Sequence, residues 1–177
     1  MKQKEERGNS IFFRMRINTF SILLFMICLF PSGNAFPQSG KVPPFRMMQS
    51  DGRVFMAQYL PAGKPVMIIY FSPDCEECQK LTSSLLTRID EFKEVSIAMI
   101  TYQPVKIMTE YVKKNKLTNY LNIYAGTEYP GLFVRNYYNI MHFPFVALYT
   151  KNGDLVKTYN DKEVNIDDFL ARIKLLK

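Results

Sequence analysis

The sequence predicts an α/β fold in which a mixed β-sheet is flanked by helices on both faces. Val66–Phe71 is a continuous apolar run with β-branched and aromatic residues, which is typical of a central strand buried on both faces. The segments that follow alternate between helical and strand-like patterns, and this order requires a parallel pair joined by a crossover. Asn152-Gly153 lies between two strand-like runs and predicts a hairpin, so the sheet also contains an antiparallel pair.

The first half of this fold is predicted from turn residues and apolar spacing. Cys78, Leu81 and Leu85 begin an apolar stripe at helical spacing, which predicts a helix soon after the first buried strand. Turns that contain glycine or proline separate the strand-like runs that precede this helix. In chain order, the expected elements are strands at 45–48, 54–60, 66–71 and 95–101, with helices at 78–92 and 105–115.

The second half contains one segment whose pattern is ambiguous, residues 117–129. The C-terminal helix is better defined, because Asn165 is a good N-cap and Asp168 occupies the third helical position. The other expected elements are a short helix at 132–138 and the two hairpin strands at 145–149 and 155–159.

Composition and charge exclude several classes of protein. The 177-residue chain is 47% hydrophobic, which excludes a disordered protein and fits one domain. The formal net charge is +7, but no dense stripe of lysine and arginine interleaved with aromatics is present, so no nucleic-acid partner is expected. Three cysteines are too few for a disulfide-stapled miniprotein. No dinucleotide fingerprint is present, and we expect a monomer that uses no cofactor.

Residues 1–35 are expected to be an export signal and not part of the fold. They contain a basic start, an apolar run at Thr19–Phe30, and small residues at Gly33 and Ala35, where a signal peptidase reads the chain. The apolar run is shorter than the roughly 20 residues that span a bilayer. Retention of this segment as an uncleaved membrane anchor stays open. The rest of the protein is expected in the periplasm or another extracytoplasmic compartment.

Two further stretches complete the expected organisation. Residues 36–44 contain three prolines and a glycine, which predicts an extended lead-in, and the folded domain is expected at 45–177. Cys28 lies inside the apolar run of the signal and is interpreted as a small hydrophobe. Cys75 and Cys78 are then the cysteines of the domain.

The chemistry is expected at Cys75-Glu76-Glu77-Cys78, where a strand ends and a helix begins. Unpaired backbone N–H groups at a helix N-terminus favour negative charge, so the first cysteine of such a pair is expected to react as a thiolate. Cys75 is therefore the candidate nucleophile. Cys78, one helical turn later, is expected to resolve a mixed disulfide formed at Cys75.

Two structural interpretations compete with redox chemistry at this pair. A zinc site needs two further ligands, and the chain offers one histidine, His142, and no second cysteine pair. A static disulfide between residues three apart closes a very small loop and stabilises little. An exported compartment is oxidising, so a close cysteine pair there is expected to cycle between dithiol and disulfide. We therefore favour redox chemistry without a metal.

Two separate motifs carry a resemblance to a known family. The first is Gly63-Lys64-Pro65-Val66, which leads through Tyr70-Phe71-Ser72-Pro73-Asp74 to the cysteine pair. The second is Tyr138–Tyr149 followed by Asn152-Gly153. Together they resemble the thioredoxin superfamily, specifically its exported TlpA-like disulfide reductases, in which the second motif holds a cis-proline, a strand and a tight turn. The resemblance covers about residues 42–177, nearly all of the mature chain.

The resemblance implies a thioredoxin-like fold in which Pro144 is the cis-proline packed beside the cysteine pair. The backbone of Phe143 would then pair with an extended substrate segment, and Pro73 and Asp74 would border the same substrate site. The implied activity is reduction or exchange of disulfides in exported proteins. The electrons would come from a thiol donor in the membrane or the periplasm.

The chain departs from the family pattern around the cysteines. Asp74 stands where the family usually has tryptophan, Glu76 and Glu77 replace small residues or proline, and Ile69 occupies the position of a buried proton-accepting acid. The three acidic side chains are expected to be solvated, and their charges oppose thiolate formation at Cys75. We therefore predict a reductant or a neutral exchanger and not a strong oxidant.

Three other functions stay open. A peroxidase of the peroxiredoxin branch shares the fold, although the Ser72-Pro73-Asp74 segment lacks the threonine that such enzymes use. A copper(I) metallochaperone would use Cys75, Cys78 and His142 as ligands. A binding module with a vestigial pair would show no reductase activity. His142 is also a candidate proton shuttle, but a solvent-facing loop residue is the simpler interpretation.

Overall fold

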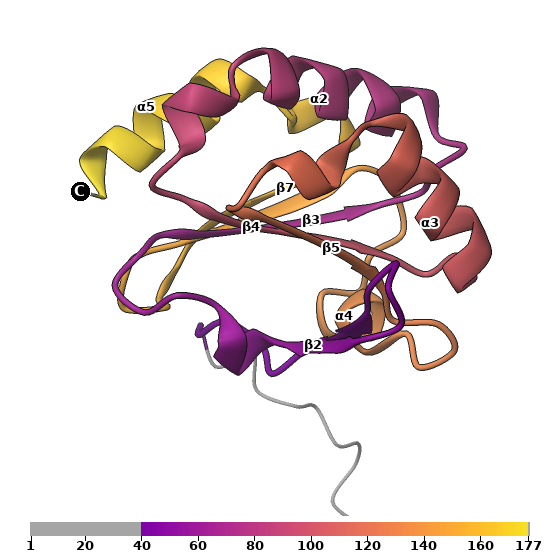
Figure 1. Ribbon diagram of the computed structural model, residues 1–177. Helices are drawn as coiled ribbons and strands as arrows, with labels where there is room; N and C mark the ends of the chain where they lie inside the picture. Colours follow the sequence, from indigo (N-terminus) through magenta and orange to yellow (C-terminus); the bar gives the residue numbers. More distant parts are fainter. Residues whose placement is uncertain (1–39, 177) are drawn as a thin grey trace, which may run out of the picture. The chain divides into compact units, whose positions relative to one another are not determined.

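The computed structural model of the protein describes residues 40–176, which fold around a mixed β-sheet (Figure 1). The strand order is β2-β1-β5-β4-β3-β6-β7. β4 pairs in parallel with both β3 and β5, whereas β6 pairs antiparallel with both β3 and β7. The mixed α/β sheet predicted from the sequence is therefore confirmed. The strands are β1 (Arg46–Met48), β2 (Val54–Met56), β3 (Val66–Phe71), β4 (Ser96–Thr101), β5 (Ile123–Thr127), β6 (Phe145–Tyr149) and β7 (Leu155–Tyr159).

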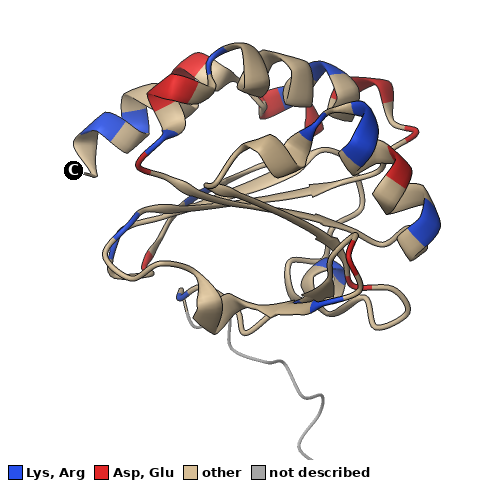
Figure 2. Cartoon of the chain, viewed as in Figure 1, with Lys and Arg blue, Asp and Glu red and all other residues tan. Residues whose placement is uncertain are grey.

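Helices and the N-terminal hairpin cover the two faces of the sheet. Three helices, α2 (Glu76–Thr87), α3 (Val105–Lys114) and α5 (Ile166–Leu175), lie over one face. The hairpin of β1 and β2 pairs with β5 at one end of the sheet and folds back over the other face, where it lies with the short helix α4 (Phe133–Tyr137). Charged residues are concentrated on the helices and turns, and the central strands carry few of them (Figure 2). Short 3-10 helices occur at Ala57–Tyr59, Ile89–Phe92, Leu117–Asn119 and Asp161–Glu163.

Strand β3 supplies both hydrophobic cores, because its side chains alternate between the two faces of the sheet. Met67, Ile69 and Phe71 pack in the core under α2, α3 and α5. Ile68 and Tyr70 pack in the core formed with β1, β2 and α4. All six residues of β3 are buried, as a central strand requires. The end of this strand is therefore a rigid place from which to present the residues that follow it.

The structure differs from the sequence prediction mainly in two places. The strand expected at 54–60 ends at Met56, and residues 57–59 form a 3-10 turn. The ambiguous segment 117–129 contains a 3-10 turn and then β5, which pairs with β4 inside the sheet. A glycine within β5, Gly126, weakens the strand pattern in the sequence, since glycine is disfavoured in strands.

The expected export signal at 1–35 lies outside the described residues, as do residues 36–39 of the lead-in expected at 36–44. Within 40–44, Lys41 forms an isolated antiparallel bridge with Asp154. No helix within residues 40–176 is long and apolar enough to cross a membrane.

Candidate functional site

The cysteine pair lies at the junction between β3 and α2. A tight turn at Ser72–Asp74 leaves the strand, and Cys75 N–H donates to Ser72 O at 3.1 Å. Cys75 is the N-cap residue of α2, with extended backbone angles (φ −80°, ψ 121°). Its sulfur accepts a hydrogen bond from Cys78 N–H at 3.2 Å. The helix therefore directs a backbone donor at this sulfur, an arrangement that stabilises negative charge.

The two sulfur atoms lie 2.6 Å apart, and the Cys78 thiol donates toward Cys75 Sγ. Both cysteines are free thiols, but they differ in exposure: Cys75 is half-buried and Cys78 is fully buried. Burial raises the pKa of the Cys78 thiol, and the hydrogen bond to Cys75 raises it further. Cys75 is therefore the sulfur of the pair that solvent can reach, while Cys78 is held as a thiol beside it.

The cis-proline segment approaches the pair from the other side. The Phe143–Pro144 peptide bond is cis, and the Phe143 carbonyl accepts from Cys75 Sγ at 3.7 Å. Pro144 is buried, Phe143 is half-buried, and β6 begins at the next residue. The fold thus brings together Cys75, Cys78, Phe143 and Pro144, which are far apart in the sequence.

The acidic residues around the pair are exposed and take part in local pairing. Glu76 and Glu77 each lie 2.9 Å from Lys80 Nζ on the first turns of α2. The hydrogen bond from Lys80 lowers the pKa of Glu76. Asp74 is exposed and accepts a hydrogen bond from the Ser72 hydroxyl. Pro73 is half-buried, and its carbonyl accepts from Gln79 Nε2 at 3.0 Å.

His142 is exposed, two residues before Pro144. Within residues 40–176, no cluster of three or more His, Cys, Asp or Glu side chains is arranged to hold a metal ion. The structure therefore does not bring His142 together with Cys75 and Cys78 as a ligand set.

The structure adds polar groups that the sequence reasoning did not single out. Ser72 is buried, and its hydroxyl lies 3.3 Å from the Tyr102 hydroxyl and 3.5 Å from Gln103 Nε2. Glu128, at the end of β5, is also buried, and Tyr70 donates a 2.7 Å hydrogen bond to it. For Glu128, the only available sequence signal was its place directly after a strand, and the sequence pattern of that strand was ambiguous.

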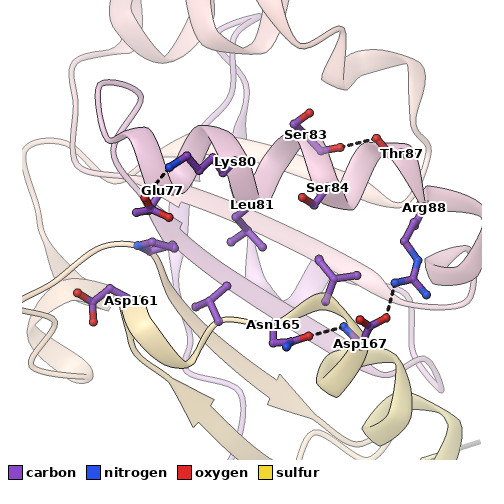
Figure 3. Close-up of a pocket in the computed structure, with 13 residues that line it drawn as sticks. Glu77, Lys80, Leu81, Ser83, Ser84, Thr87, Arg88, Asp161, Asn165 and Asp167 are labelled. Atoms are coloured by element: carbon purple, nitrogen blue, oxygen red, sulfur yellow. Dashed lines mark hydrogen bonds and ion pairs between the residues drawn. The ribbon is translucent and has the colours of Figure 1, made fainter.

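A groove of about 490 Å³ lies between α2 and the start of α5 (Figure 3), and Pro144 is one of the residues that line it. Glu77, Lys80 and Leu81 line it from the first turns of α2. Asp161 and Asn165 line the opposite side, on the segment that leads into α5. The groove is open to solvent and lined by polar and apolar groups, and it shares Pro144 with the cis-proline segment.

The fold and the cysteine pair define a thioredoxin-like protein. A family model described as a thioredoxin-like domain matches residues 54–174, and the chain belongs to this family. This confirms the superfamily expected from the two sequence motifs. A comparison with functionally curated proteins found no match.

Several solved structures are similar to the chain over three quarters of its length. A secreted disulfide oxidoreductase of Mycobacterium tuberculosis, described as homologous to E. coli DsbE, has a TM-score of 0.62 at 21% identity and covers 75% of this chain and 96% of its own. Copper-bound ScoI of Arabidopsis thaliana has a TM-score of 0.59 at 19% identity, with coverages of 75% and 95%. A peroxiredoxin-like protein of Aquifex aeolicus has a TM-score of 0.63 at 14% identity, with coverages of 77% and 85%. These likenesses establish the fold.

Proposed function

We propose that the protein is a thiol–disulfide oxidoreductase that reduces or exchanges disulfides in exported proteins through Cys75 and Cys78. The observation that carries this proposal is the asymmetry of the pair. One sulfur is reachable and faces the Phe143 carbonyl, and its partner is buried 2.6 Å away. A static disulfide or a vestigial pair needs no such difference between the two thiols.

The reaction follows from this arrangement. The Cys75 thiolate attacks one sulfur of a substrate disulfide, the substrate S–S bond breaks, and the departing substrate sulfur takes up a proton. Cys78 then loses its proton and attacks Cys75 Sγ, which releases the second substrate thiol and leaves a Cys75–Cys78 disulfide. Two electrons pass from the protein to the substrate. A thiol donor protein of the membrane or the periplasm must supply two electrons to restore the pair.

Two features support a polypeptide as the substrate. The backbone of Phe143 lies beside Cys75, where an extended chain can pair with it in the manner of an added strand. The groove between α2 and α5 is lined in part by Pro144, and it has the room and the mixed lining to hold further residues of such a chain (Figure 3). An exported location is supported by the signal-like pattern of residues 1–35 and by the secreted M. tuberculosis protein of similar fold.

The experiment that tests the proposal is substrate trapping with Cys78→Ser in the native host. Loss of the resolving thiol should leave substrates attached to Cys75 as mixed disulfides that reducing agents release. Cys75→Ser serves as the matched control, because it keeps one thiol but removes the reachable one. Failure of folded Cys78→Ser to capture any protein, or equal capture by both variants, contradicts the proposal.

Peroxide reduction and copper binding are alternative functions that the structure favours less than disulfide reduction or exchange. Peroxide consumption by Cys78→Ser tests the first, since a peroxidase needs only the attacking cysteine for the initial step. Stoichiometric copper(I) binding that is lost in His142→Ala tests the second. The described site gives copper no third ligand, because His142 is exposed and forms no cluster with the cysteines.

A further inference from the structure

Glu128 is a buried carboxylate that the proposed reaction does not use. It is 7% exposed and lies just after β5. Its Oε1 atom accepts from the Tyr70 hydroxyl at 2.7 Å, and its Oε2 atom accepts from Val134 N–H at 2.7 Å. A third donor, Arg135 N–H, lies 3.2 Å from Oε1. A buried charge is tolerated when several donors satisfy it, and here the donors come from two different segments.

These hydrogen bonds tie α4 to the central strand of the sheet. Tyr70 is near the end of β3, five residues before the attacking cysteine. Val134 and Arg135 belong to α4, a helix of five residues, which is too short to be stable without tertiary contacts. Glu128 therefore fixes the place of α4, and of the Arg135 side chain, relative to the strand that leads into the active site.

Arg135 carries this connection on to the cis-proline segment. Its guanidinium carbon lies 5.6 Å from the centre of the Phe143 ring and 5.3 Å from that of Tyr102. The two rings are themselves stacked, with centres 5.4 Å apart, and Tyr70 packs against Phe143 at 5.9 Å. Arg135 Nε also donates to the Ile140 carbonyl at 3.4 Å. A guanidinium over aromatic faces is an attractive contact, and Arg135 makes it on the residue that flanks Cys75.

The Phe143 ring is an important anchor of the segment that approaches Cys75. Asn139, Met141 and His142 are exposed, so the segment between α4 and β6 is held mainly by Ile140 and Phe143. The carbonyl of Phe143 lies 3.7 Å from Cys75 Sγ, and its main chain is the part expected to pair with a substrate. Contacts that hold the ring therefore also set where a bound substrate meets the attacking sulfur.

We propose that Glu128 and Arg135 are positioning residues that hold Phe143 beside Cys75 for pairing with a polypeptide substrate. This inference rests on the proposed function, because it assigns the two residues a part in substrate docking. It assigns neither residue a part in the thiol chemistry of the cysteines. Binding of a protein substrate should depend on Arg135, whereas the intrinsic reactivity of Cys75 should not.

The test measures steady-state reduction of the insulin disulfides by wild type and by Arg135→Met, which keeps an unbranched apolar side chain but removes the guanidinium. We expect kcat/KM to fall about tenfold through a higher KM, with kcat changed less than about twofold. The rate at which iodoacetamide alkylates Cys75 should be unchanged. Arg53→Met is the matched control, since Arg53 is exposed in the β1–β2 turn. This variant should have the kcat, the KM and the alkylation rate of wild type. Arg135→Lys, which keeps a cation near the rings, should recover part of the loss.

A double-mutant cycle tests whether the two residues act as one unit. If Glu128 acts through Arg135, Glu128→Gln should raise KM, and the double variant should be no worse than Arg135→Met alone. The inference is overturned if the increase in KM of the double variant equals the product of the two single increases, or if Arg135→Met has the KM of wild type.

Amide hydrogen exchange separates failure of this inference from failure of the proposed function. In Arg135→Met, residues 139–143 should exchange at least several-fold faster, while β3 and β4 stay protected. If wild type does not reduce insulin, the proposed function fails, and exchange still decides whether Arg135 holds the segment. Unchanged exchange at 139–143 overturns the positioning role whether or not wild type is active.

Discussion

Cys75 and Cys78 share a sequence environment but differ in exposure, because one caps α2 and the other lies one turn inside it. Cys78 faces the core formed with Leu81 and Leu85, and Cys75 faces the Phe143 carbonyl and solvent. The raised pKa of Cys78 follows mainly from its burial. The proposed division of roles between an attacking and a resolving thiol therefore follows from the position of each residue at the start of the helix.

This difference predicts selective alkylation of the reduced protein. Iodoacetamide at pH 7 should label Cys75 and leave Cys78 unlabelled until the chain is unfolded, as measured by tandem mass spectrometry. In Cys75→Ser, labelling of Cys78 should keep increasing above about pH 9, because its pKa is raised above that of an ordinary thiol. Equal labelling of the two cysteines at neutral pH would contradict the assignment.

The residues of the two sequence motifs were predictable, but the distant residues that contact them in the fold were not. The Cys-x-x-Cys spacing and the cis-proline segment are local patterns, so they can be read from the sequence. The contact between Tyr70 and Glu128 joins residues 58 positions apart, and nothing local in either segment indicates it. The contact of Arg135 with the Phe143 ring likewise joins α4 to the segment before β6, and no local pattern indicates it.

At the scale of elements, α5 depends on its N-cap. Asn165 Oδ1 accepts from Asp167 N–H at 2.8 Å and from Asp168 N–H at 3.4 Å. The helix also buries Phe169, Leu170 and Ile173 in the core under α2 and α3. The cap was predicted from the sequence, because an N-cap is a short-range pattern.

Removal of the cap should destabilise the domain measurably. Asn165→Ala should lower the free energy of unfolding by about 1 kcal/mol, since two backbone N–H groups lose their partner. Asn119→Ala is a suitable control: Asn119 is exposed, and its replacement should change stability by less than about 0.5 kcal/mol. Urea denaturation measures both values. Equal stability of the two variants would show that the cap contributes nothing.

Strand β5 shows why one element was ambiguous in the sequence. Gly126 lies opposite β1, and a Cβ atom placed on it would come within 2.8 Å of both Met47 Cγ and Met48 O. The glycine that weakens the strand pattern is therefore required by the close approach of the neighbouring backbone. Local propensity cannot reveal this requirement, because it arises from a strand more than 75 residues away.

Substitution at this position should be costly. Gly126→Ala should lower the free energy of unfolding by about 1–3 kcal/mol, because the Met47 side chain can move but the Met48 carbonyl cannot do so without disturbing β1. Thermal or urea denaturation checks the value. Wild-type stability in this variant would mean that β1 and β5 are not held at the distance described.

At the scale of the whole molecule, the fold brings two chain segments that are distant in the sequence together at one sulfur atom. The end of β3, the start of α2 and the segment before β6 meet at Cys75, and two cores fix them from opposite faces of the sheet. The sheet and its helices were predictable because a buried strand, a crossover and an Asn-Gly hairpin leave few topologies open. The groove between α2 and α5 could not be predicted from the sequence, because it depends on how α5 packs against α2 (Figure 3).

A redox titration of the purified chain in glutathione buffers decides whether Cys75 and Cys78 form a working pair. Burial and the hydrogen bond to Cys75 raise the pKa of Cys78, so ionisation of this thiol does not stabilise the reduced state. The acidic side chains of Asp74, Glu76 and Glu77 beside the pair oppose further negative charge there. We predict a reversible two-electron transition with a potential below about −180 mV, in the range of thioredoxins and glutaredoxins. A potential near about −120 mV, where strong oxidants lie, or the absence of a reversible transition, would contradict this assignment.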